Sequence, residues 1–175
     1  MGRIVVTEFM SLDGVVEDPG GGEDYEHGGW SFEISRGDEG DRFKLDEAMQ
    51  SDALLLGRRT YETFAASWPE RGSEVPNADW MNNTRKYVVS TTLDSPEWQN
   101  STVIEGDVAE ALTRLKQENG KNIMVNGSAT LVRSLLRDNL LDELRLFVHP
   151  VVMGSGEALF QGDAARRLIF LNVGA

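Results

Sequence analysis

Apolar positions along the chain follow two spacings, one typical of strands and the other typical of helices. Short runs of branched and apolar residues, such as residues 4–9 and 53–56, indicate buried strands. In other stretches, such as residues 108–118 and 129–137, apolar residues recur every three or four positions, which indicates helices that bury one face. Alternation of the two predicts a mostly parallel sheet covered by helices on both faces.

The predicted strands cover residues 4–9, 53–56, 86–90, 102–104, 122–125, 141–152, 157–160 and 168–173, and the predicted helices cover residues 41–50, 58–66, 108–118 and 129–137. The last three strands follow one another without a helix, which favours antiparallel pairing along one edge of the sheet. A length of 175 residues suits one domain. We therefore expect a single three-layer α/β domain over residues 1–175, with a mostly parallel central sheet and antiparallel C-terminal strands.

Composition excludes several kinds of site. The chain has no cysteine, so it has no disulfide, cysteine nucleophile, zinc–thiolate centre or iron–sulfur cluster. Its two histidines, His27 and His149, are far apart in the sequence, and we expect no bound metal. His149 stands in an apolar run before a proline, where a structural role is the expected one.

Charge narrows the range of partners. The chain has 17 basic and 29 acidic residues, for a net charge of −12 at pH 7. A surface of this sign repels nucleic-acid backbones and anionic membranes, so we expect neither as a partner. No apolar run approaches the roughly 18–20 residues of a membrane span, and the first residues lack the features of a signal peptide. A cytoplasmic location is expected.

Ligands of open parallel sheets bind beyond the carboxyl ends of the strands, so the residues that follow each strand are candidates. Gly57, Arg58, Arg59 and Thr60 follow a predicted buried strand and open a helix. The glycine allows close approach of a ligand, and the start of a helix offers unpaired N–H groups. The two arginines form either a phosphate clamp or a solvated helix start paired with nearby carboxylates.

A second junction of the same kind follows residues 122–125. Gly127 permits close approach, Ser128 can cap the next helix, and Ala129 and Thr130 belong to its first turn. An ordinary strand–turn–helix junction has the same sequence pattern. Two such junctions in one small sheet favour a ligand with separated phosphate groups.

Ser90 and Thr91 end a further predicted strand. Their hydroxyl groups suit a phosphate or a ribose, although ordinary turns have the same composition. None of the three junctions matches the GxGxxG fingerprint of dinucleotide-binding folds or the lysine-containing phosphate loop of nucleotide hydrolases. The sequence therefore disfavours those two folds.

Two further residues are expected near the mouth of the site. Asp13 follows the first strand, where a carboxyl group with a raised pKa can donate or relay a proton, although an Asp-Gly turn has the same sequence. Trp30 could form one wall of a pocket for a flat ring, although packing is the more common role of tryptophan. Both belong to a long polar segment, residues 13–41, and long loops of compact domains are often functional.

Eight short motifs occur in one order: Ser11-Leu12-Asp13-Gly14, Leu56-Gly57-Arg58-Arg59-Thr60-Tyr61, Tyr87-Val88-Val89-Ser90, Gly127-Ser128, Leu141-Asp142-Glu143-Leu144, Pro150, Gly154-Ser155-Gly156 and Leu159-Phe160. In these motifs the chain resembles the dihydrofolate reductase-like superfamily, and within it the C-terminal domain group of riboflavin biosynthesis reductases. The resemblance covers nearly the whole chain, about residues 3–170.

The resemblance implies an NADPH-dependent reductase that forms a homodimer and transfers a hydride to a small substrate. Thr60 and its neighbours would hold the pyrophosphate, Ser90 and Thr91 the phosphate on the adenosine side, and residues 127–130 the pyrophosphate and the nicotinamide ribose. Asp13 would lie at the mouth shared by the nicotinamide and the substrate. In place of the paired glycine common in this family, the chain has Asn126-Gly127.

The substrate stays open between a pterin-like or pyrimidine-like heterocycle and a carbonyl compound. The alternatives to an enzyme are a nucleotide-binding or dimerisation module that has lost catalysis, and an interaction domain without a ligand. Because Arg58 and Arg59 concentrate positive charge in an acidic chain, we expect NADPH, with its additional phosphate, to bind better than NADH.

Overall fold

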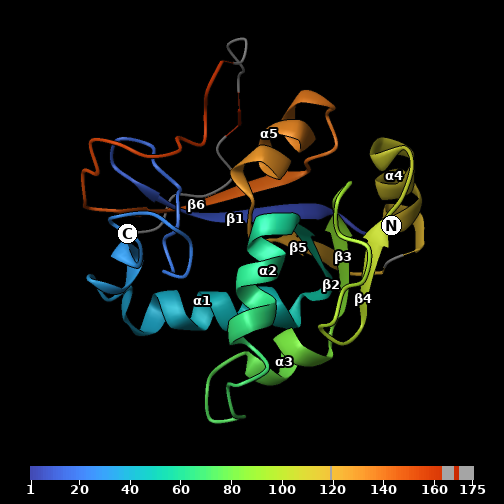
Figure 1. Ribbon diagram of the computed structural model, residues 1–175, viewed down its shortest axis with the longest axis horizontal. Helices are drawn as coiled ribbons and strands as arrows, with labels where there is room; N and C mark the ends of the chain where they lie inside the picture. Colours follow the sequence, from blue (N-terminus) through green and yellow to red (C-terminus); the bar gives the residue numbers. More distant parts are fainter. Residues whose placement is uncertain (119, 163–167, 170–175) are drawn as a thin grey trace.

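Branched and apolar residues fill the central strands, as a sheet covered on both faces requires. Ile4, Val5 and Val6 are almost fully buried, and so are residues 54–56. The computed structural model describes residues 1–118, 120–162 and 168–169. In this part of the chain six strands form one sheet in the order β4-β3-β2-β5-β1-β6, and every neighbouring pair is parallel (Figure 1).

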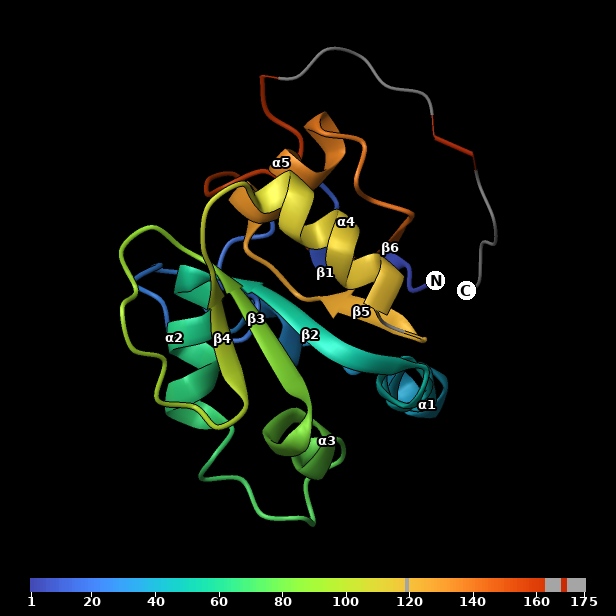
Figure 2. The same cartoon turned by 90° about the vertical axis from the view of Figure 1, so that its right-hand side faces the viewer.

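The strands are β1 (Ile4–Ser11), β2 (Ser51–Gly57), β3 (Arg85–Val89), β4 (Ser101–Ile104), β5 (Asn122–Val125) and β6 (Glu143–His149). The helices are α1 (Gly37–Met49), α2 (Arg58–Ser67), α3 (Ala78–Asn83), α4 (Val108–Glu118) and α5 (Ala129–Arg137), with a short 3-10 turn, η1 (Trp30–Phe32). Helices α1, α2 and α3 cover one face of the sheet, and α4 and α5 cover the other (Figure 2). The three-layer α/β fold and the mostly parallel sheet predicted from the sequence are confirmed.

Each face of the sheet has its own apolar core. On the face of α4 and α5, Ile4, Val6 and Leu55 pack with apolar residues of both helices. On the opposite face, Leu54 and Leu56 pack with Tyr61 of α2. This division follows the alternation of side chains along each strand. No helix in the described part of the chain is long and apolar enough to cross a membrane.

The antiparallel arrangement expected at the C-terminal end is wrong for β6. This strand runs parallel to β1, from Val5 opposite Glu143 to Ser11 opposite His149. Helix α5 lies between β5 and β6, and a crossover of this kind returns the chain to the same end of the sheet. Residues 157–160 make only an isolated antiparallel bridge, between Val15 and Ala158.

Two further differences concern short elements. Of the last predicted strand, residues 168 and 169 are not in a strand, and residues 170–173 lie outside the described part of the chain. Helix α3 was not predicted, because six residues are too few to establish a helical spacing of apolar positions. The other predicted elements are present with bounds shifted by at most a few residues.

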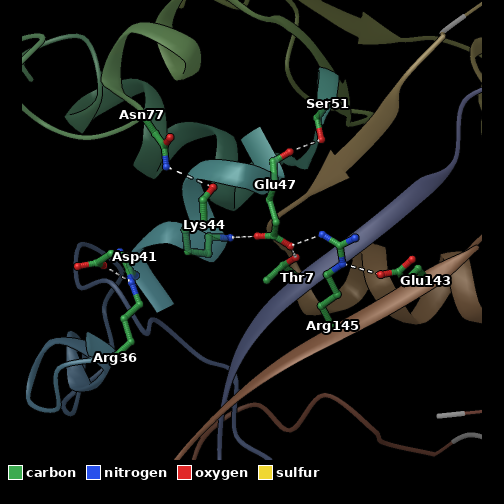
Figure 3. A network of polar contacts seen from close by, with 9 residues as sticks. All are labelled: Thr7, Arg36, Asp41, Lys44, Glu47, Ser51, Asn77, Glu143 and Arg145. Carbon is green, nitrogen blue, oxygen red and sulfur yellow. Dashed lines mark hydrogen bonds and ion pairs between the residues drawn. The ribbon is translucent and has the colours of Figure 1, made fainter. Parts of the chain in front are cut away.

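A buried carboxylate joins α1 to the β1–β6 side of the sheet (Figure 3). The Glu47 side chain, 3% exposed, accepts hydrogen bonds from Thr7 Oγ1 of β1, from Lys44 Nζ at 2.7 Å and from Arg145 Nη1 of β6 at 2.9 Å. Burial lowers the pKa of Lys44, and the Glu47 carboxylate opposes this shift. The negative charge of Glu47 therefore compensates two buried or half-buried cations at once.

The replacement Glu47→Gln removes this charge and keeps the shape of the side chain. Because Lys44 and Arg145 then lose their shared counter-charge, we expect the free energy of unfolding to fall by roughly 3–5 kcal/mol. Urea unfolding followed by circular dichroism measures this loss. The control is Asp41→Asn, which breaks the exposed Arg36–Asp41 pair and should change stability by less than about 1 kcal/mol. Equal losses in the two variants would contradict the assignment.

Candidate functional site

Because all six strands are parallel, their carboxyl ends meet along one edge of the sheet, and two strand–helix junctions there touch each other. The N–H of Gly57 donates to the carbonyl oxygen of Gly127 at 3.3 Å. A Cβ atom added at Gly57 would lie 2.3 Å from Ser128 Oγ, and one added at Gly127 would lie 2.8 Å from Thr60 Oγ1. The structure thus brings together residues from two separate sequence motifs, Gly57 and Thr60 from one and Gly127 and Ser128 from the other.

Both junctions open helices whose first N–H groups have no partner within the helix. Ser128 caps α5, with its side chain accepting from the N–H of Leu131 at 3.5 Å, whereas α2 has no side-chain cap among the described residues. The Gly127–Ser128 peptide bond is cis, and Gly127 has a φ of 98°, which favours glycine. Ala129 is buried and Thr130 is exposed in the first turn of α5. Two sets of N–H donors therefore lie at this edge, next to backbone with no room for further side chains.

A cleft of about 590 Å³ lies beside the first junction, beyond the ends of β3 and β4. It is lined by Arg58, Val89, Ser90, Thr91, Thr92, Leu93, Asp94, Val103, Ile104, Glu105, Gly106 and Val108. Ser90 Oγ accepts from the N–H groups of Thr92 and Leu93 at 3.1 and 3.0 Å, which fixes the turn that forms one wall. Three predicted residues, Arg58, Ser90 and Thr91, thus share one cleft.

The two arginines predicted to act together point to different partners. Arg58 lines the cleft and donates from Nη1 to both carboxylate oxygens of Glu62 at 3.0 Å. Arg59 instead forms an ion pair with Glu23, a residue of the long polar segment after β1, at 3.1 Å. Consecutive residues of a helix are about 100° apart around its axis, and this separates them. A joint clamp by both arginines is therefore corrected to a single arginine, Arg58, at the cleft.

Asp13 lies where it was expected, after β1, but its carboxylate is already occupied. It accepts hydrogen bonds from Ser11 Oγ at 2.6 Å and from the N–H groups of Met153 and Gly154 at 3.0 and 2.8 Å. These bonds, the one from Ser11 foremost, lower the pKa of Asp13 to about 2. The group is ionised at neutral pH and has no proton to donate. It holds the turn after β1 against the loop after β6.

Trp30 is buried rather than open to a ligand. Its side chain is 2% exposed, its Nε1 donates to the carbonyl oxygen of Glu17 at 2.8 Å, and its ring packs edge-on against His149. The prediction that Trp30 forms a pocket wall is corrected to a packing role in this structure. His149 is also buried and hydrogen-bonds through Nδ1 with the carbonyl oxygen of Phe147, as expected of a structural residue.

Two polar residues at the same edge were not predicted from the sequence to be site residues. Glu8 of β1 is 7% exposed, and Asn126 follows β5 directly. The Oε1 atom of Glu8 and the Oδ1 atom of Asn126 are buried without a hydrogen-bond partner in the described part of the chain. Burial raises the pKa of Glu8 to about 8, against the opposing charge of Lys44. An acidic residue within an otherwise apolar strand was the signal in the sequence.

The sheet order, the helices on both faces and the paired junctions define the class of the protein, a three-layer α/β domain with a parallel sheet (Figure 2). The chain belongs to the RibD C-terminal domain family, whose model matches residues 3–173. This confirms the resemblance seen in the sequence motifs.

Relatives and solved structures agree with this assignment. Two uncharacterized proteins of Bacillus subtilis (strain 168) are similar in sequence: YyaP is 30% identical over 163 residues and YwjB is 34% identical over 158, each match covering 90% of this chain and 80% or 82% of the relative. A protein of Shewanella sp. PV-4 described as a riboflavin biosynthesis protein has a TM-score of 0.70 at 21% identity, covering 93% of this chain and 84% of that one. RibD of Acinetobacter baumannii has a TM-score of 0.62 at 17% identity, covering 95% of this chain and 51% of that one. The solved structures show a shared fold.

The contact between the junctions can be tested with Gly57→Ala. The added methyl group would collide with Ser128 at the tightest point of the edge, so we expect the free energy of unfolding to fall by roughly 1–3 kcal/mol. Thermal unfolding followed by circular dichroism measures this. Gly20→Ala is the matched control, because a methyl group there meets nothing within 4 Å and its effect should stay within about 1 kcal/mol. A Gly57→Ala variant as stable as the control would refute the close contact.

Proposed function

We propose that this protein is an NADPH-dependent reductase that transfers a hydride to a small heterocyclic or carbonyl substrate. The observation that carries the proposal is the contact between the two junctions, Gly57 against residues 127 and 128, beside the cleft that Arg58 lines. Two helix starts and an arginine along one edge suit a ligand with several separated phosphates. Membership of the RibD C-terminal domain family supports the same proposal.

The residues at this edge fit NADPH as a cofactor. Gly57 and Gly127 leave the space that a Cβ would fill, and the N–H groups at the starts of α2 and α5 suit the pyrophosphate. The cleft with Arg58, Ser90 and Thr91 suits the phosphorylated adenosine end. The buried, unpaired Oδ1 of Asn126 suits an N–H donor of the ligand, such as a carboxamide.

When bound, the reduced nicotinamide would supply the hydride, and the chain's own residues would bind and orient the two reactants. The starts of α2 and α5 compensate negative charge, and the buried backbone around Gly127 excludes water from one side of the site. The ionised Asp13 holds the loop at residues 153 and 154 over the end of β1. A pterin-like or pyrimidine-like ring, or a small carbonyl compound, is the proposed substrate.

Cofactor choice tests the proposal. Arg58→Ala should reduce the preference for NADPH over NADH by about 1.5–3 kcal/mol for each charged hydrogen bond lost, because the additional phosphate of NADPH loses its partner. Fluorescence titration of both cofactors against the unaltered protein and the variant measures this, and the preference should weaken as salt rises. Arg59→Ala is the matched control, since Arg59 pairs with Glu23 outside the cleft and should leave the preference unchanged. Equal affinity of the unaltered protein for NADPH and NADH would refute the assignment.

Assembly is a second part of the proposal. Strand β6 is the last strand of the sheet among the described residues, and Val148 on it is half exposed. We expect two copies of the chain to associate along this side as a homodimer. Light scattering at micromolar concentration should give twice the chain mass of 19.4 kDa. A mass equal to that of one chain would refute this part and leave cofactor binding untouched.

A further inference from the structure

Glu8 lies in β1 at a level of the sheet where one of its two neighbouring strands has already ended. It follows Ile4 and Val6 on the side of β1 that faces α4 and α5. Strand β5 pairs with β1 only as far as Val6 opposite Val125, whereas β6 continues alongside β1 to Ser11. Glu8 therefore has Leu146 of β6 beside it on one side, and on the other side β5 has ended and the chain turns into α5. Glu8 thus lies at the level of the sheet where β5 has ended and the chain turns through Gly127 into α5.

The surroundings of Glu8 favour its neutral form. No hydrogen-bond donor of the described residues reaches Oε1, and the side chain is almost fully buried. Two charges act on it: Lys44 of α1 favours the carboxylate, and Glu157 of the loop after β6 disfavours it. Glu157 is itself paired with Arg133 of α5, and Lys44 is paired with Glu47. Desolvation dominates, and it raises the pKa of Glu8 to about 8.

A purely structural role explains Glu8 poorly, as a comparison with Glu47, the structural carboxylate that α1 packs against the same strand, makes clear. Glu47 is buried to a similar extent and accepts hydrogen bonds from three side chains of three elements. Among the described residues Oε1 of Glu8 has no partner at all, and an unpaired buried polar atom destabilises a fold. Other buried, unpartnered oxygens exist, but those of Asp52 and Ser101 lie at the starts of β2 and β4, on the opposite edge.

We infer that Glu8 is the proton donor of the proposed reductase site, an inference that rests on the proposed function. Its substrate is a compound with a C=N or C=O bond, whose nitrogen or oxygen lies against the Glu8 carboxyl group. The carbon of that bond gains the hydride from NADPH, which leaves as NADP⁺. The nitrogen or oxygen gains the proton of Glu8, and the resulting carboxylate takes its next proton from water. Asp13, ionised by its three hydrogen bonds, is left with a positioning role.

The first test observes the Glu8 proton in the protein without any ligand. The protein is enriched with ¹³C at glutamate carboxyl carbons, and the NMR signal that disappears in Glu8→Gln is followed from pH 4 to pH 10. We expect this signal to titrate with a midpoint near 8. The control is Glu110→Gln, a change at an exposed residue of α4, which should leave the Glu8 signal and its titration unchanged. A Glu8 midpoint below about 5 would overturn the inference.

The second test asks whether Glu8 lies close to the nicotinamide ring of the bound cofactor, as a proton donor to the carbon–heteroatom bond that receives the hydride must. The nicotinamide ring is positively charged in NADP⁺ and neutral in NADPH, whereas the phosphate groups of the two cofactors are the same. A nearby carboxylate favours the positive ring, and an opposite charge within about 4–6 Å shifts a pKa by one unit or more. The ratio of the Kd for NADP⁺ to the Kd for NADPH should therefore fall at least about tenfold between pH 6 and pH 10.

In Glu8→Gln this ratio should stay constant within about twofold over the same range, while Glu110→Gln should behave like the unaltered protein. Turnover of any substrate found by screening should fall by roughly 10²–10⁴-fold in Glu8→Gln, with the Kd for NADPH little changed near pH 7. If neither cofactor binds the unaltered protein, the proposed function fails together with the inference. If both bind and their ratio does not change with pH, only the inference about Glu8 fails.

Discussion

The site depends on one close contact, that between the turns which follow the two central strands. Strands β2 and β5 are parallel neighbours, and they end at nearly the same level, so the chain must leave the sheet twice in one small space. Helix α2 then starts over one face and α5 over the other (Figure 2). The two turns fit side by side because positions 57 and 127 are both glycine; a Cβ atom at either position would collide with a side chain of the other turn. The glycines that make room for this crossing also leave backbone N–H groups open at the edge.

Two buried carboxylates at strand β1, Glu8 of the strand itself and Glu47 of helix α1, have opposite electrostatic roles. Glu47 is surrounded by donors and joins α1 to β1 and β6, so its charge is part of what holds this side of the sheet together (Figure 3). Glu8, one residue beyond Thr7 on β1, points to the other face and has no donor of the described residues at Oε1. The alternation of side chains along a strand is enough to place neighbouring residues in these different environments.

Most of the fold was predictable because long apolar runs and helical spacings are local signals. The direction of β6 was not, because it depends on α5 crossing the sheet, which is a property of the whole topology. The glycine junctions were also recognisable as strand–turn–helix patterns. The pairing of Arg59 and the burial of Trp30 depend on distant partners, Glu23 and His149, that no local pattern identifies. Glu8 had a local signal, an acid in an apolar strand, but its position relative to the site depends on where β5 ends.

A chain with a net charge of −12 can hold an anionic cofactor only where local geometry outweighs the overall field. Most cations in the described part of the chain are already paired with acids, as Lys116 is with Asp142 and Arg133 with Glu157 in half-buried pairs. Arg58 is also paired, with Glu62, but that pair is exposed, and an exposed pair is weak enough for a phosphate to compete with it. The N–H groups at the starts of α2 and α5 do not depend on side-chain pairing at all. The backbone N–H groups at the two helix starts, held in place by the contact between Gly57 and Gly127, therefore create a positive potential at this edge of the sheet despite the acidic composition of the protein.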